Sequence, residues 1–186
     1  IEDRRFFEHP GIDFIGIARA ALKNITGRSH EGASTITMQV ARNFFFHKRK
    51  EFTRKFNEIL LAFRIEEAFS KEEIFSLYAN KMFLGKTAYG FAAAGQVYYG
   101  KSLKDLSLAQ LAMIAGLPKA PSRYNPIANP ERAMERRDWI LGRMVKLGTI
   151  TDMAYQTALA ETDEATYHGS KSELDADYVA EMVRQE

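Results

Sequence analysis

EFTRKFNEILLAFRIEEAF, at residues 51–69, repeats apolar side chains at three- and four-residue steps, the period of an α-helix. One apolar arc of the helical wheel holds Phe52, Phe56, Ile59, Leu60 and Phe63, but Leu61 and Ile65 lie on the opposite side, next to Glu58. The pattern therefore predicts a helix that is apolar nearly all round and buried.

The Glu58 side of this helix also carries Arg54 and Lys55. A buried carboxylate with cations beside it is a candidate functional site, because burial and charge partners act on its pKa in opposite directions. An ordinary ion pair along the helix surface is the alternative interpretation, and the spacing alone leaves both open.

The preceding segment, GASTITMQVARN at residues 32–43, predicts a second helix that begins at Ser34. Backbone N–H groups at such a start favour an anion, and further polar contacts are available from Thr35, Gln39, Arg42 and Asn43. The alternative is a Ser-capped helix without a ligand.

Three aromatics and three cations follow in FFFHKRK, residues 44–50. Phe44 to Phe46 with Lys48 to Lys50 suit docking onto an anionic membrane surface. The alternative interpretation of the same segment is a buried aromatic turn followed by a solvated basic loop.

The first residues, IEDRRFFEHPG, set Glu2 and Asp3 beside two aromatics and His9. This is the composition of an active site, although acidic pairs at a domain edge are also common on solvated surfaces. We expect His9 to stabilise a turn by hydrogen bonding, since no other histidine lies at metal-ligand spacing. A catalytic group so near a chain end would be mobile, which predicts that the chain was cut from a longer protein.

Downstream the pattern stays helical, and strand signals are weak. We expect helix starts at Asp13, at Ser70 with Glu73 as a capping box, at Ser107, and at Asn129 with Pro130 following. Gly27, Gly85 and Gly148 are the predicted helix ends. The polar stretch after Asp163 predicts a linker toward another domain.

Composition narrows the function classes. The chain has 186 residues, 46% of them hydrophobic, which is enough for a sizeable core in a single domain. A net charge of +2 argues against a nucleic-acid partner bound through a whole-surface field, and the lack of cysteine excludes a thiol nucleophile. No apolar run approaches the roughly 20 residues of a membrane span, so we expect any anchor to precede this segment.

Taken in order, five blocks resemble the motifs of the peptidoglycan glycosyltransferases, the family that polymerises lipid II in class A penicillin-binding proteins. They are EDRRFFEHPG, GASTITMQ, RKFNE, KEEIFSLYANKMFLG and RRDWILGRM, running from Glu2 to Met144. The second block departs from the family pattern at Met38, where a first glutamine is usual, and Arg42 stands where lysine is common.

The resemblance implies a mainly α, lysozyme-like fold with two lobes, a long catalytic cleft and a small membrane-proximal lobe. It implies residues 1–162 as the glycosyltransferase domain and 163–186 as a linker toward a transpeptidase region, making the parent protein also a D,D-transpeptidase. Glu2 becomes the general base and Glu58 the second essential carboxylate. The substrate-binding set is Asp3, Ser34, Thr35, Gln39, Arg42, Asn43, Arg54 and Lys55.

The same resemblance implies lipid II and the growing glycan as partners, on the outer face of the bacterial inner membrane. It implies no organic cofactor, whereas a divalent cation such as Mg²⁺ or Mn²⁺ could assist the leaving diphosphate. Two other functions compete: a lysozyme-like hydrolase, and a catalytically silent scaffold for wall assembly. The Arg54 and Lys55 pair favours a diphosphate-lipid substrate over a neutral glycan, and two intact glutamates argue against a silent scaffold.

Overall fold

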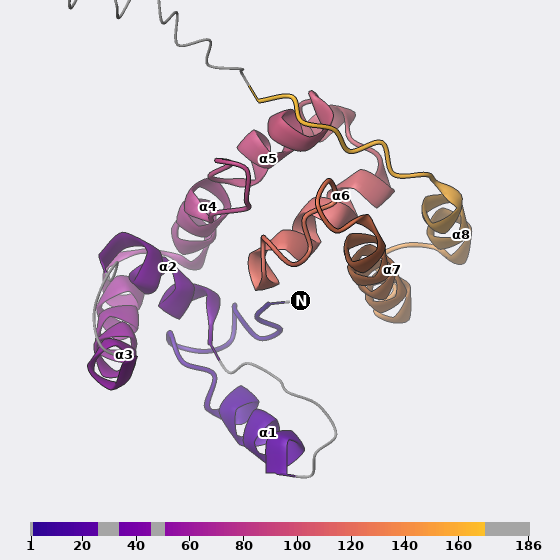
Figure 1. Ribbon diagram of the computed structural model, residues 1–186. Coiled ribbons are helices and arrows are strands. Elements are labelled where there is room, and N and C mark those ends of the chain that lie inside the picture. Colours follow the sequence, from indigo (N-terminus) through magenta and orange to yellow (C-terminus); the bar gives the residue numbers. More distant parts are fainter. Residues whose placement is uncertain (1, 26–33, 46–50, 170–186) are drawn as a thin grey trace, which may run out of the picture.

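The computed structural model describes residues 2–25, 34–45 and 51–169, without the side chains of residues 23, 45 and 51–54. These residues fold into helices, and the only β pairing among them is an isolated bridge between Phe83 and Tyr89. The prediction of a mainly α fold is therefore confirmed (Figure 1). The helices are α1 (Phe14–Ile25), α2 (Ile36–Phe45), α3 (Glu51–Ala68), α4 (Lys71–Lys81), α5 (Phe91–Tyr99), α6 (Leu108–Gly116), α7 (Pro130–Lys146) and α8 (Asp152–Ala160), with short 3₁₀ turns η1 (Leu103–Asp105) and η2 (Leu117–Lys119).

Local capping signals explain most helix starts. Asp13 accepts a hydrogen bond from the backbone of Gly16 at 2.8 Å and so caps α1. Ser70 forms a full capping box with Glu73 at α4, and Ser107 does the same at the start of α6.

Two helix boundaries and one side-chain cap differ from the sequence expectation, whereas the start of α7 at Pro130 is confirmed. Helix α2 begins at Ile36, and its cap is Thr35 instead of Ser34, because the Thr35 hydroxyl accepts from Met38 N at 3.2 Å. Asn129 precedes α7, but its amide donates to Ser122 O and makes no cap. Helix α4 ends at Lys81, four residues before Gly85.

Gly85 instead allows the backbone after α4 to approach the side chain of Tyr98 closely. Its φ is +86°, and a Cβ there would lie 2.7 Å from the hydroxyl of Tyr98. That buried hydroxyl donates to Leu84 O at 2.9 Å, so the turn after α4 is fixed against α5.

Helix α3 is not buried all round, contrary to the expectation from its apolar composition. Phe56 is 62% exposed and Leu60 is half exposed, while the buried side holds Glu58, Ala62 and Ile65. The helix packs against α2 and, more lightly, α4. The face with the carboxylate is thus the one that the fold covers, whereas Phe56 and Leu60 of the apolar arc face outward.

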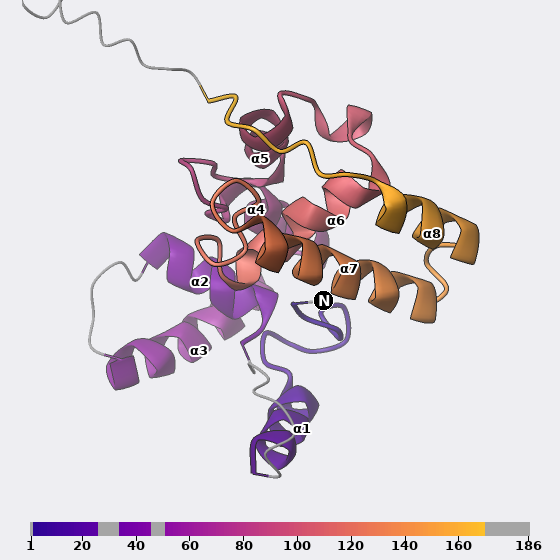
Figure 2. The same ribbon diagram turned by 45° about the vertical axis from the view of Figure 1, so that its right-hand side comes forward.

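The main core lies between α2, α4, α5 and α6, and includes Ile74, Tyr98 and Ile114. A second cluster joins α6, α7 and α8 around Ile140 and Leu141. Figure 2 shows α7 lying along α6, with the N-terminal segment beside them. Helix α6 therefore belongs to both clusters and connects them.

The segment after α8 packs back onto α5. Thr166 N donates to Tyr98 O at 3.0 Å, His168 N donates to Val97 O at 2.8 Å, and the Tyr99 hydroxyl donates to Asp163 at 2.8 Å. The described segment therefore contacts α5 as far as His168, and the domain boundary at residue 162 stays a prediction. The remainder of the predicted linker, 170–186, lies outside the described residues.

Helix α1 stands apart from the other helices in both views, at the end of the molecule away from α5 (Figures 1 and 2). Its surface exposes large apolar side chains, among them Phe14, Ile15 and Ile25. Within the described part of the chain, no helix has the length and apolar character needed to cross a membrane.

Candidate active site

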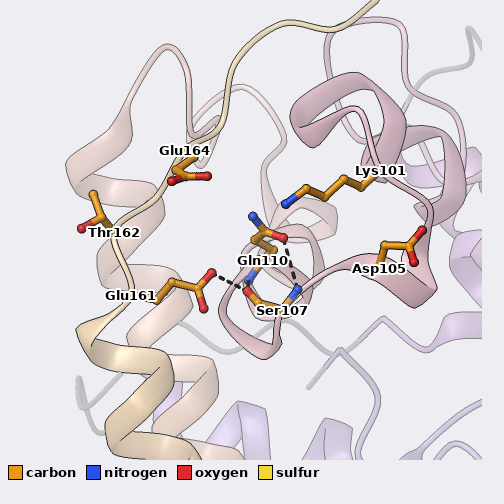
Figure 3. Close-up of a pocket in the computed structure, with 7 residues that line it drawn as sticks. All are labelled: Lys101, Asp105, Ser107, Gln110, Glu161, Thr162 and Glu164. Atoms are coloured by element: carbon orange, nitrogen blue, oxygen red, sulfur yellow. Dashed lines mark hydrogen bonds between the residues drawn. The ribbon is translucent and has the colours of Figure 1, made fainter.

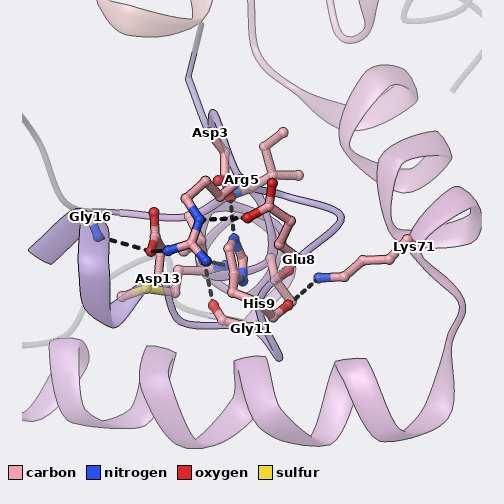
Figure 4. A network of polar contacts seen from close by, with 12 residues as sticks. Asp3, Arg5, Glu8, His9, Gly11, Asp13, Gly16 and Lys71 are labelled. Atoms are coloured by element: carbon pink, nitrogen blue, oxygen red, sulfur yellow. Dashed lines mark hydrogen bonds and ion pairs between the residues drawn. The ribbon is translucent and has the colours of Figure 1, made fainter.

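A buried polar network fixes the loop that carries Glu2 (Figure 4). Asp3 accepts from Ile36 N at 3.0 Å, and its same oxygen lies 2.9 Å from Nε2 of His9. Lys71 donates to His9 O at 2.6 Å and to Glu66 at 2.7 Å. The loop is therefore tied to α2, α3 and α4, and the expectation that His9 is a hydrogen-bonding group is confirmed.

Asp3 is almost wholly buried in this network, so its carboxylate already serves two protein partners. A charged acceptor at a helix start stabilises the N-terminal end of the dipole. Contact of Asp3 with substrate stays a prediction.

Glu2 lies between α4 and α7. Its carboxylate accepts from Nη2 of Arg136 at 3.3 Å, and the Arg136 guanidinium lies over the ring of Trp139, 4.6 Å from its centroid. On the other side, burial and then the negative charge of Glu2 raise the pKa of Tyr78. The predicted base is thus a partly exposed carboxylate beside a buried cation and a buried phenol.

Glu58 is 1% exposed, which confirms the burial expected of it. Lys55 donates to Glu58 at 3.3 Å and to the Ser34 hydroxyl at 2.9 Å, while its side chain remains half exposed. The structure therefore brings together a carboxylate, a cation and a hydroxyl from two separate sequence blocks. The side chain of Arg54, predicted to join them, lies outside the described residues.

The start of α2 offers fewer donors than the sequence suggested. Ile36 N already donates to Asp3 and Met38 N to Thr35, so the expectation of unoccupied N–H groups is wrong for these two. Thr35 is itself buried and donates to Gly11 O at 2.6 Å. An anion near this helix would be held mainly by side-chain cations.

The other predicted contacts along α2 differ in exposure. Gln39 is buried, Arg42 is half-buried, and the Asn43 amide contacts Met82 Sδ at 3.6 Å. Met38, the departure from the family pattern, is buried in the interior. Roles in substrate binding for these residues stay predictions.

Arg136, Tyr78 and Lys71 were not assigned roles from the sequence. Arg136 falls in the fifth block and Tyr78 and Lys71 in the fourth, so the blocks contained them without indicating what they contact. An adjacent arginine pair on a helix with a buried side was the available signal.

Neither a metal-ligand group nor the pocket among the described residues supports the predicted site. Among the described residues, no group of three or more His, Asp or Glu could hold a metal ion, and the near neighbour of Glu58 is a lysine ammonium. A polar pocket of about 430 Å³ lies where α6 meets the segment after α8 (Figure 3). It is lined by Lys101, Ser107, Gln110 and Glu161, none of which is a predicted site residue.

The helical fold carries one carboxylate in the N-terminal block and a second carboxylate paired with a cation, an arrangement compatible with a transglycosylase. The chain belongs to this family: the transglycosylase family model matches residues 1–145.

The relatives are penicillin-binding proteins. The chain is 56% identical over all 186 residues to penicillin-binding protein 1A of Pseudomonas aeruginosa, and 52% identical to that of Neisseria gonorrhoeae. It spans 23% of the length of each. A crystal structure of penicillin-binding protein 1A from Haemophilus influenzae matches with a TM-score of 0.54 and 40% identity, over 81% of this chain and 19% of that one.

Proposed function

We propose that the chain is a peptidoglycan glycosyltransferase that polymerises lipid II into β-1,4 glycan strands and releases undecaprenyl diphosphate. The observation that carries the substrate class is Lys55, held between Ser34 and Glu58 with half of its side chain exposed. Departure of a diphosphate needs a cation at the leaving oxygen, whereas hydrolysis of a neutral glycan does not.

In this proposal Glu2 is the general base. It takes the proton from the 4-hydroxyl of the incoming acceptor, whose oxygen attacks the anomeric carbon of the donor chain while the bond to the diphosphate breaks, with inversion. The partial exposure of Glu2 supports the role, because a base must reach substrate.

Lys55 stabilises the charge that grows on the departing diphosphate, and Glu58 orients its ammonium. Arg42 and Arg54 are the further cations assigned to this anion. A divalent cation would have to be shared between Glu58 and the substrate, since the described residues supply no complete ligand set, and no step above requires it.

The proposal places the domain against the outer face of the bacterial inner membrane. Support comes from the exposed apolar residues of α1 and from Phe44, which is partly exposed; Phe46 and Lys48 to Lys50 lie outside the described residues. Replacing Phe44, Phe45 and Phe46 by serine should reduce liposome binding more than melting temperature. A large loss of melting temperature with unchanged binding would assign these rings to the core.

The test of function is incubation of the intact protein with lipid II, with products resolved by size. Glycan polymer is the expected product; shortened glycan would indicate a hydrolase, and unchanged lipid II a scaffold. We further propose a D,D-transpeptidase in the full-length protein, by analogy with the named relatives, testable by labelling with a fluorescent penicillin.

A further inference from the structure

Within the described part of the chain, Arg136 has one hydrogen-bonding partner, and that partner is the proposed base. Its side chain is 8% exposed, and among the described residues Glu2 is the only acceptor within hydrogen-bonding distance of the guanidinium. Its Nε is buried and makes no hydrogen bond. A buried arginine normally satisfies several donors, so this guanidinium is poorly explained as a structural cross-link.

Packing, not hydrogen bonding, fixes where this guanidinium lies. The rings of Trp139 and Tyr124 have centroids 4.6 and 5.8 Å from its central carbon. Helix α6 comes so close at Gly116 that a Cβ there would lie 2.9 Å from Cγ of Arg136. Both the stem and the head of the side chain are therefore held before substrate arrives.

Its neighbour Arg137 provides a contrast within the same helix. Arg137 is more deeply buried, at 2% exposure, but it donates to Asp138 at 2.8 Å and to Glu161 O at 2.9 Å, which ties α7 to the end of α8. Arg137 thus has a complete structural explanation, and Arg136 does not.

No other described group orients the Glu2 carboxylate. The Tyr78 hydroxyl is buried within the electrostatic reach of Glu2, yet it makes no hydrogen bond. A glutamate side chain with three rotatable bonds needs a fixed partner to keep its oxygens at one place.

We propose that Arg136 is the positioning residue for the general base: it holds the Glu2 carboxylate in the orientation that receives the proton of the acceptor hydroxyl. The inference rests on the proposed function, because it presupposes that Glu2 is the base. A displacement of about 1 Å in a catalytic group costs on the order of 100-fold in rate. Arg136 acts on turnover through Glu2 and makes no contact with the reacting atoms.

The test compares Arg136→Gln and Arg136→Lys with Arg137→Lys in the intact protein, by kcat, KM for lipid II and melting temperature. Arg136→Gln should lower kcat by about 10- to 100-fold with KM within about twofold. Arg136→Lys, which keeps a donor and a charge, should recover part of that loss. Arg137→Lys should lower the melting temperature and leave the kcat of the folded protein unchanged.

The decisive comparison is made in a Glu2→Gln background, by single-turnover assay of the residual activity. If Arg136 acts only through Glu2, adding Arg136→Gln there should cause no further loss. A further loss of the full 10- to 100-fold in that background would overturn the inference. In the single variant Arg136→Gln, an unchanged kcat would also overturn it, and so would a kcat loss that merely follows the loss of melting temperature. Failure of the unmodified protein to make polymer would instead overturn the proposed function, and this inference with it.

Discussion

Lys55→Ala should separate catalysis from folding more sharply than any other single change at the Glu58 site. The alanine variant loses the 2.9 Å hydrogen bond to Ser34 and the 3.3 Å contact with Glu58. The Lys55 side chain is 46% exposed, so water and salt screen both contacts in the free protein.

The two expected magnitudes differ widely. For folding, the Lys55 end of the pair is half exposed, so water can replace the ammonium beside buried Glu58, and the loss should be about 1 kcal/mol, or about 2–4 °C in melting temperature for a domain of this size. For turnover, removal of one preorganised charge-stabilising donor costs about 100-fold, or about 2.7 kcal/mol of barrier. Lys55→Ala should raise the free energy of the transition state more than that of the bound substrate, because negative charge on the diphosphate grows as the glycosidic bond breaks.

The assay is polymerisation of labelled lipid II at saturating and limiting substrate, together with thermal melting. Arg64→Ala, at an exposed position of the same helix, is the matched control and should leave both readouts unchanged. Lys55→Arg should recover part of the turnover. Normal turnover with weakened lipid II binding in Lys55→Ala would refute the leaving-group role and reassign this cation to docking.

Other changes should affect base chemistry, packing and alkaline stability separately. Glu2→Gln should abolish polymerisation with an unchanged melting temperature; activity within about tenfold of the unmodified protein would remove Glu2 from the base role. Lys71→Met breaks its contacts with Glu66 and His9 O and should destabilise by about 3 kcal/mol in chemical unfolding, against less than about 0.5 kcal/mol for exposed Lys81→Met. Burial raises the pKa of Tyr98 to about 12 from 10.0, so its neutral hydroxyl stabilises fully below pH 10.0 and less as pH rises through about 12. Between pH 10.0 and about 12 the unfolding free energy should therefore fall less steeply with pH in Tyr98→Phe than in the unmodified protein. An equally steep fall in both proteins would show that Tyr98 does not cause it.

The sequence predicted the features that depend on neighbours along the chain. The capping box at Ser70 and Glu73 is complete within four residues, and the cap at Ser107 is likewise a local signal. Burial of Glu58 was also predictable, since the apolar residues Leu61 and Ile65 lie on the same side of the helix. These signals are local and need no knowledge of the tertiary fold.

Features that depend on contacts between segments distant in the sequence could not be predicted. Composition made α3 appear buried on every side, but only the structure reveals that Phe56 faces outward while Glu58 faces α2. Thr35 caps α2 in place of Ser34 because Asp3 and Gly11 O, from another block, meet that turn. Nor does periodicity indicate which of two adjacent arginines points at Glu2.

The contact between Glu2 and Arg136 joins residues 134 positions apart. During synthesis the N-terminal block leaves the ribosome first, and α7 follows only after most of the domain has been translated. Until then the Arg136 guanidinium cannot reach Glu2, whatever local helices have formed. A nascent chain that ends before α7 therefore carries the proposed base without its proposed positioning residue, and long-range contacts of this kind form slowly in folding. On the proposed function, competence to polymerise would be acquired only after α7 has packed against the N-terminal block.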